Sequence, residues 1–209
     1  MRALSGRVLG SLLALLTIVG CAINRDLAVS QTRTISSFQS LGPHKLVYRA
    51  RVAKDCHIAQ YQTIFIHEVD IQHIPPKQAD LAREAAQEFR NVLRHRLETI
   101  FPDKRVIFAS NDPVTPRTLH LHCAITELKP GNGFVRWAFA MGWGASVVQL
   151  EGRGTEEGRA EALFEFARKK SFDGYPMGGL NVAVLDNEAT LKQSMEQLAK
   201  DVASFLSSL

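Results

Sequence analysis

Two long segments with a helical repeat of apolar residues constrain the fold of this 209-residue chain most strongly. The first begins at Pro75-Pro76 and is stopped by Pro102, and proline is tolerated in a first helical turn because its missing N–H would be unpaired there. Apolar residues recur at steps of three and four in both segments: Leu81, Ala85, Phe89, Val92, Leu93, Leu97 and Ile100, and then Leu191, Met195, Leu198, Val202, Phe205 and Leu209. Each apolar stripe requires another layer of structure to cover it.

The remaining segments have the patterns of β-strands that would supply that layer. Strands are expected at residues 46–52, 63–69, 106–108, 118–127, 147–152 and 160–167. Residues 154–158 should form a hairpin turn, after which Phe164 and Phe166 face inward with Ala160 and Ala162, while Glu165 lies outside. The helices are segregated from a run of hairpin strands. This order predicts an α+β two-layer sandwich, with a mixed, mostly antiparallel sheet and the two long amphipathic helices on one face.

The first 20 residues have the pattern of an export signal. Arg2 and Arg7 precede the apolar residues 8–19, and small Gly20 stands directly before Cys21, where a signal peptidase needs an unhindered bond. The apolar run of about a dozen residues is shorter than the roughly 20 that cross a bilayer, which disfavours an uncleaved anchor helix. A plain secretory signal is the other alternative.

The sequence Ile18-Val19-Gly20-Cys21 resembles the lipobox of bacterial lipoproteins. The resemblance implies diacylglycerol on Cys21, cleavage before it, and acylation of the new N-terminus by a fatty acid such as palmitate, which together would anchor the chain on a membrane. Because Ala22 follows where Asp favours the inner membrane, the resemblance also implies the outer membrane, with the domain facing the periplasm. We therefore expect a signal peptide at 1–20, a lipidated cysteine with a flexible Ser/Thr/Gln-rich tether at 21–45, and one α+β domain at 46–209.

Charge and cysteine usage fit an exported chain. Without Arg2 and Arg7, 23 basic and 21 acidic side chains remain, a balance that is not typical of nucleic-acid binding. With Cys21 assigned to lipid, Cys56 and Cys123 are left as an even pair in an oxidising compartment. They can form a disulfide or remain two small buried side chains, and the sequence leaves both alternatives open.

Residues with catalytic or metal-binding potential are few. His120 and His122 point the same way along a strand, at a spacing that lets two imidazoles meet one metal ion, and His67, Glu68 and Asp70 could lie beside them. The alternative is that these histidines face solvent or are covered by a helix. We predict no metal site and no cofactor. Cys56 and the adjacent His57 would point to opposite faces of a strand, and no nucleophile elbow, zinc-protease motif or phosphate-binding loop occurs. The sequence therefore predicts no catalytic residues and no enzyme activity.

The stretch from Trp137 to Leu150 lacks any charged side chain. Together with the two residues before it, its first part would form a strand with Val135, Trp137, Phe139, Met141 and Trp143 on one face, and Arg136 and small residues on the other. We predict an interaction surface made by Arg136, Trp137, Phe139, Met141 and Trp143, for a partner protein or lipid. An ordinary buried hairpin and a pore-forming hairpin are the alternatives.

Several of these motifs together resemble the bacterial lipoprotein family catalogued as domain of unknown function 4410. They are the lipobox, the strand at 118–127, the turn Pro130-Gly131-Asn132 with Arg136 after it, the glycines Gly142 and Gly144, and the closing amphipathic helix. The resemblance covers residues 45–208 and implies location and fold, since the family has no established activity. We hypothesise a lipid-anchored, non-enzymatic accessory or interaction component of an envelope assembly or transport system, with an envelope protein or a second copy as partner. The alternative is a periplasmic small-ligand or metal-binding lipoprotein.

Overall fold

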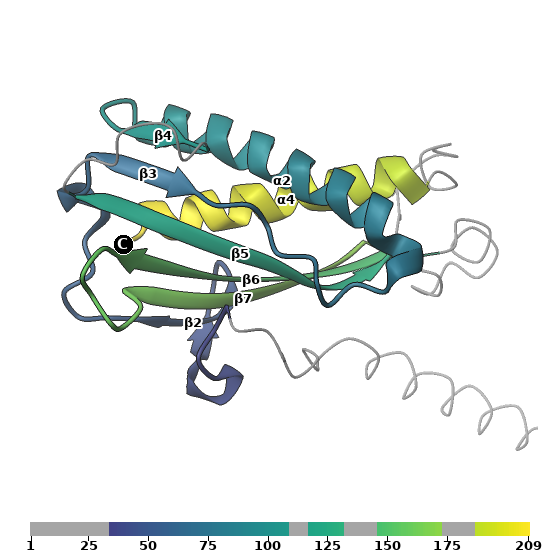
Figure 1. Cartoon of the computed structure of the whole chain (residues 1–209), viewed down its shortest axis with the longest axis horizontal. Helices are drawn as coiled ribbons and strands as arrows, with labels where there is room; N and C mark the ends of the chain where they lie inside the picture. Colours follow the sequence, from purple (N-terminus) through teal and green to yellow (C-terminus); the bar gives the residue numbers. More distant parts are fainter. Residues whose placement is uncertain (1–33, 109–116, 132–145, 173–186) are drawn as a thin grey trace, which may run out of the picture.

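The computed structural model describes residues 34–108, 117–131, 146–172 and 187–209, which form a mixed sheet with two long helices against it (Figure 1). The strands are β1 (Gly42–His44), β2 (Tyr48–Val52), β3 (Thr63–Ile66), β4 (Arg105–Ile107), β5 (Thr118–Lys129), β6 (Ser146–Glu156) and β7 (Phe164–Phe172). The helices are α2 (Ala79–Ile100) and α4 (Asn187–Ser207), with short 3-10 turns η1 (Phe38–Ser40), η2 (Ile58–Gln60) and η3 (Pro76–Gln78). The α+β sandwich predicted from the sequence is confirmed.

The seven strands lie in the order β1-β2-β7-β6-β5-β3-β4. β3 pairs in parallel with both β4 and β5, and the other neighbours pair antiparallel. A parallel pair needs a crossover, and α2 provides it between β3 and β4. The sheet is therefore mixed and mostly antiparallel, as expected.

Both helices bury their apolar stripes in one core against the same face of the sheet. Phe89, Leu93 and Leu97 of α2 and Met195 and Phe205 of α4 are all fully buried. Arg168 of β7 also pairs with Asp201 of α4 at 2.8 Å, on this side of the sheet. Ile100 departs from the predicted stripe, because it is the last residue of α2 and its side chain remains 38% exposed.

Two glycines shift the predicted boundaries of the last hairpin. Gly152 lies opposite Phe166 and Gly154 opposite Phe164, and a Cβ on either glycine would overlap the ring that covers it. The glycines thus make room for aromatic rings within β6 and do not begin a turn. β6 runs to Glu156 and β7 begins at Phe164, so the expected turn at 154–158 and strand start at residue 160 are wrong.

The N-terminal part of the domain begins earlier than predicted. Ile35 and Leu41 are buried against Ala167 of β7, and β1 pairs with β2. Residues 34–45 are thus folded, although they were expected to belong to the tether, because isolated hydrophobic residues among the serines pack on the sheet. Within the four described stretches, no helix is long and apolar enough to cross a membrane.

Candidate functional site

The second face of the sheet carries polar and ionisable side chains and no described helix. Along β5, Leu119, Leu121 and Cys123 join the core under the helices, so the alternation of the strand places His120 and His122 on the opposite face. We call this opposite side the helix-free face. Its polar and ionisable side chains make it a candidate for contact with a ligand or partner, although several of them, such as Glu151 and Glu165, are buried.

Three histidines meet on this face and form what we call the histidine cluster: His67, His120 and His122. His67 Nε2 lies 3.0 Å from His120 Nδ1, and the His67 and His122 rings stack with centroids 4.0 Å apart. The parallel pairing of β3 with β5 places Phe65 opposite His120, and Phe65 packs edge-on against His67 with ring centroids 4.4 Å apart. The cluster therefore depends on residues that are 53 positions apart in sequence, His67 directly after β3 and His120 in β5.

Burial keeps two of these imidazoles neutral at pH 7. It lowers the pKa of His67 to about 4, with further lowering by His122, His120 and Arg90. Burial likewise lowers the pKa of His122 to about 4, helped by Arg153 and His120. His122 Nε2 also lies 3.3 Å from the Thr155 hydroxyl oxygen of β6. The cluster is thus a set of hydrogen-bonding and stacking groups in which burial and neighbouring positive charge both oppose protonation.

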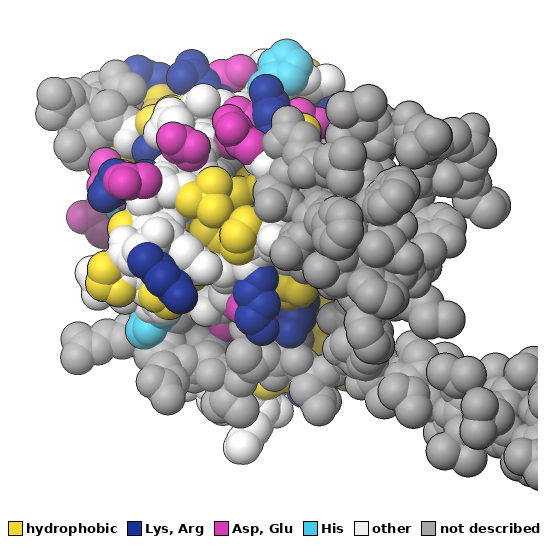
Figure 2. Space-filling view, turned by 90° about the vertical axis from the view of Figure 1, so that its right-hand side faces the viewer, with side chains coloured by type: hydrophobic (Ala, Val, Ile, Leu, Met, Phe, Trp, Pro, Cys, Tyr) yellow, Lys and Arg dark blue, Asp and Glu magenta, His cyan; other side chains and the backbone are white. Residues whose placement is uncertain are grey.

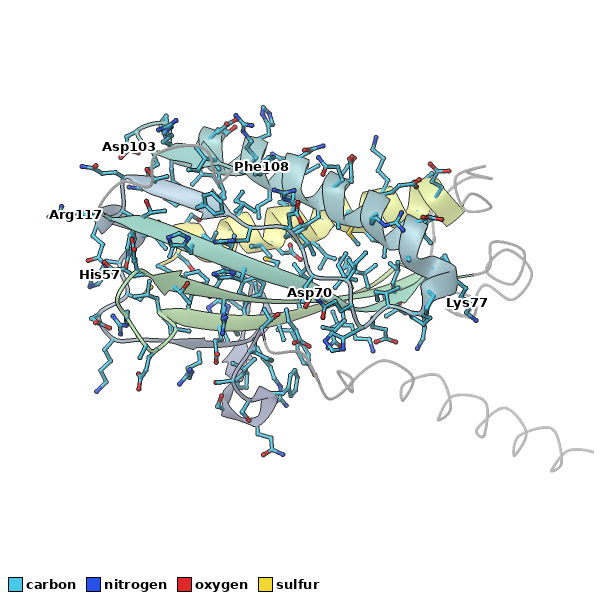
Figure 3. All side chains as sticks on the ribbon, in the orientation of Figure 1. His57, Asp70, Lys77, Asp103, Phe108 and Arg117 are labelled. Carbon is cyan, nitrogen blue, oxygen red and sulfur yellow. The ribbon has the colours of Figure 1, made fainter. Side chains whose placement is uncertain are left out.

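The cluster brings together the three histidines considered as metal ligands, but not in a chelating arrangement. The stacked rings of His67 and His122 are inclined by only 17°, so their ring edges do not converge on one point. Asp70 (labelled in Figure 3) is bridged through its backbone to Ala124, and its carboxylate accepts a hydrogen bond from the Gln72 backbone N–H at 2.8 Å. Glu68 is exposed. Among the residues that the structure describes, no three His, Cys, Asp or Glu side chains form a metal-binding group.

An ionic row crosses the helix-free face beside the cluster. Strand register places Arg153 between His122 and Glu165, and Arg51 on the far side of Glu165. Glu165 is only 1% exposed, in contrast to the outward position expected from the sequence. Its carboxylate accepts hydrogen bonds from the Ser36 N–H at 2.8 Å, the Ser36 hydroxyl at 2.9 Å and Arg51 at 3.1 Å. The folded N-terminal segment buries this side chain, and strand periodicity alone could not reveal that segment.

A groove lies between the N-terminal halves of α2 and α4. Its volume is about 510 Å³, and its walls combine apolar side chains with three glutamates and Lys192, which pairs with Glu88 at 3.8 Å. It is lined by Leu81, Glu84, Ala85, Glu88, Glu188, Ala189, Leu191, Lys192 and Met195. Figure 2 shows the corresponding end of the molecule, where hydrophobic side chains are bordered by acidic ones. The groove therefore combines apolar surface with charged groups of both signs.

The segment predicted as an interaction surface connects the longest pair of strands. β5 and β6 pair from Leu119 and Glu156 to Lys129 and Val147. The link between the strands thus spans residues 130–145. The predicted contact residues, Arg136, Trp137, Phe139, Met141 and Trp143, lie outside the described residues, as does Cys21.

Cys56 and Cys123 are both free and buried, so the disulfide considered from the sequence is not formed. Cys123 belongs to the face of β5 under the helices, and Cys56 precedes η2. Both join the apolar core cluster, which corresponds to the second alternative, two small buried side chains.

We expect neither thiol to react in the folded protein. Burial raises the pKa of Cys56 to about 11 and that of Cys123 to about 12, and only the thiolate is a nucleophile. Iodoacetamide at pH 8 should therefore modify both residues only after denaturation, as read by intact mass. A mass two hydrogens lower, with modification only after reduction, would instead show a disulfide.

The comparisons with known proteins concern family and fold. No curated protein matches the sequence. Among solved structures, the PelC dodecamer from Paraburkholderia phytofirmans is similar at 10% identity, over 72% of this chain and 94% of that chain, with a TM-score of 0.42. A DUF330 protein from Xanthomonas campestris is similar at 10% identity, over 74% and 90%, with a TM-score of 0.43. A putative neuraminyllactose-binding hemagglutinin homolog from Helicobacter pylori has 12% identity, over 75% and 86%, and a TM-score of 0.33.

The family comparison covers most of the chain. The profile of the domain of unknown function DUF4410 matches residues 30–204, which include every described strand and nearly all of α4. The match begins before residue 34, in agreement with a domain that includes the folded N-terminal segment. The chain therefore belongs to the DUF4410 family.

Proposed function

We propose that this chain is a lipid-anchored, non-enzymatic protein of the bacterial cell envelope. Cys21 would hold it on the outer membrane, facing the periplasm, and the domain would bind an envelope protein or a second copy of itself. The observation that supports binding most strongly is the connection between β5 and β6, which is far longer than their pairing requires.

Antiparallel neighbours are ordinarily joined by two to five residues. Here β5 ends at Lys129 and β6 starts at Ser146, and the connection includes an uncharged stretch from Trp137 onward. Residues 130–145 therefore exceed the length that the pairing of these two strands requires. Tryptophan, phenylalanine, methionine and arginine are enriched at the centres of protein interfaces, and all four occur between residues 130 and 145, which favours a binding function for this segment.

The helix-free face supports a binding role in a second way. The histidine cluster and the ionic row lie on the face opposite the apolar core, so the packing of that core does not explain them. Polar groups fixed in place by neighbouring strands lose little entropy when they meet a partner. We therefore place the partner's contact on the β5–β6 connection and the adjacent helix-free face.

A small ligand is the second candidate, and the groove between α2 and α4 favours it. A volume of about 510 Å³ falls within the range of small-molecule sites, roughly 300–1,000 Å³. This candidate uses the groove and not the histidine cluster. A ligand screen by thermal shift would detect it, since a ligand that binds only the folded state raises the melting temperature.

Photo-crosslinking in native membranes tests the proposed partner. A photoreactive amino acid replaces Trp137, Trp143 or, as control, Ile100, which is 38% exposed at the end of α2. We expect one reproducible crosslinked product from the two tryptophan positions and none from Ile100. The Trp137→Ala, Trp143→Ala double variant should lose co-purification of that product while keeping its melting temperature. No crosslink at either position, with a monomeric protein, would overturn the proposed binding role.

A further inference from the structure

The folded N-terminal segment shortens the tether to the membrane. Hydrogen bonds from Ser36 to Glu165 and burial of Ile35 fix the chain to the sheet from residue 34 onward. Only residues 22–33 then separate the domain from Cys21. A chain of twelve residues extends to at most about 43 Å. The domain is of similar size, since α2 alone has 22 residues and a length of about 33 Å.

The segment at which such a tether enters the domain packs beside the β1–β2 hairpin, with Arg49 of β2 over the Phe38 ring at 5.0 Å. The hairpin forms one edge of the sheet, next to β7, on which the segment 34–41 packs. Figure 1 shows this edge on the side of the sheet away from β4 and α2. Because β7 is the third strand from the β1 edge of the seven-stranded sheet, a short tether favours this edge over the β4 edge as the one close to the bilayer.

The hairpin and its flanks are basic. Residues 34–54 contain Lys45, Arg49, Arg51 and Lys54 but no acidic residue. Two carboxylates beside the hairpin are engaged: Glu165 with Arg51 at 3.1 Å, and Asp55 with Arg159 at 2.8 and 3.0 Å. Lys45 and Lys54 are exposed, so a net positive charge remains at this edge.

The hairpin also exposes amphipathic and apolar side chains. Tyr48 and Val52 are 39% and 38% exposed, among the most exposed large hydrophobic residues in the described part of the chain. Tyr48 has a φ of 61°, which is unfavourable for a bulky residue, and the pairing register of β2 shifts directly after it. Tyrosine is enriched where proteins meet the membrane–water interface. The edge therefore combines cationic groups with an interfacial aromatic residue.

We propose that the β1–β2 hairpin lies on the membrane that holds Cys21 and contacts anionic phospholipid headgroups through Lys45, Arg49 and Lys54, with Tyr48 at the interface. This inference rests on the proposed lipidation of Cys21. It orients the domain so that the β4 edge, at the other end of the sheet, is the one farthest from the bilayer. The hairpin supplies a second membrane signal beside the lipid.

Depth-dependent fluorescence quenching tests this orientation. The mature acylated protein with Lys45→Cys carries an environment-sensitive dye and is reconstituted in vesicles that contain nitroxide-labelled lipid. Arg96→Cys on α2 removes the same charge at an exposed position and serves as the matched control. Cys56 and Cys123 are buried, and the parent protein measures any background labelling. Vesicles of phosphatidylcholine alone are compared with vesicles that also contain phosphatidylglycerol.

We expect quenching at position 45 but not at position 96, with an increase when phosphatidylglycerol is present. The Arg49→Gln, Lys54→Gln variant should weaken this contact about fivefold for each charge removed, whereas Lys77→Gln with Lys200→Gln should not. Equal quenching at the two labelled positions, or no response to phosphatidylglycerol, would overturn the hairpin contact alone. A protein that does not float with vesicles at all would overturn both this contact and the proposed anchor.

Discussion

The Phe205→Ala variant should lower the free energy of unfolding by about 4 kcal/mol, as is typical of a large cavity in a packed core. Phe205 of α4 is fully buried. Its ring meets Phe164 at a centroid distance of 5.6 Å and Phe166 at 5.5 Å, and His44 of the edge strand at 5.1 Å. The cavity would therefore separate α4 from two strands at once, β7 and β1. Urea denaturation followed by circular dichroism measures the loss.

Ile100→Ala provides the matched control, because its side chain is 38% exposed and leaves no enclosed cavity. It should cost less than about 1 kcal/mol. A similar loss for both variants, or a loss below about 1 kcal/mol for Phe205→Ala, would contradict the packing of α4 on β7.

The folded protein should lose stability as the pH falls from about 6.5 to about 4, by on the order of 3 kcal/mol from the histidine cluster after allowance for partial exposure. The pKa values of His67 and His122 are lowered from 6.5 to about 4. In this interval the unfolded chain binds more protons than the folded protein, so protonation favours unfolding. Above pH 6.5 the contribution is complete. Denaturant titrations at several pH values measure the slope.

Histidine variants separate this effect from the titration of carboxylates. His67→Gln with His122→Gln should flatten the dependence between pH 6.5 and 4, while His95→Gln on the exposed side of α2 should not change it. An unchanged slope in the double variant would show that the two imidazoles are not held neutral by the fold.

Much of the fold follows from periodicity in the sequence. The apolar stripes of α2 and α4 predict a layer of helices, because a one-sided stripe is buried by packing on another layer. The apolar residues of β3 predict a central strand, because side chains on both of its faces are buried. The boundaries of β6 and β7 do not follow, since Gly152 and Gly154 have the composition of a turn. Their role as space for Phe166 and Phe164 appears only when the two strands are paired.

The site was less predictable, because it depends on contacts between distant segments. The spacing of His120 and His122 predicted that they share a face, but their meeting with His67 required the parallel pairing of β3 and β5. The burial of Glu165 required the segment at Ser36, which sequence composition had placed in the tether. The alternating pattern Phe164-Glu165-Phe166 does not indicate that Glu165 is buried, because it carries no information on the segment at Ser36.

Lipid anchoring through Cys21 is the step on which both the proposed function and the orientation of the β1–β2 hairpin depend. Mass spectrometry of the N-terminal peptide of the mature, membrane-extracted protein measures it directly. We expect a peptide that starts at Cys21 and carries diacylglycerol and an amide-linked fatty acid, and a Cys21→Ser variant that lacks both modifications and leaves the membrane fraction or remains uncleaved. A mature chain that begins at another residue, or at Cys21 with an unmodified thiol, would contradict the anchor.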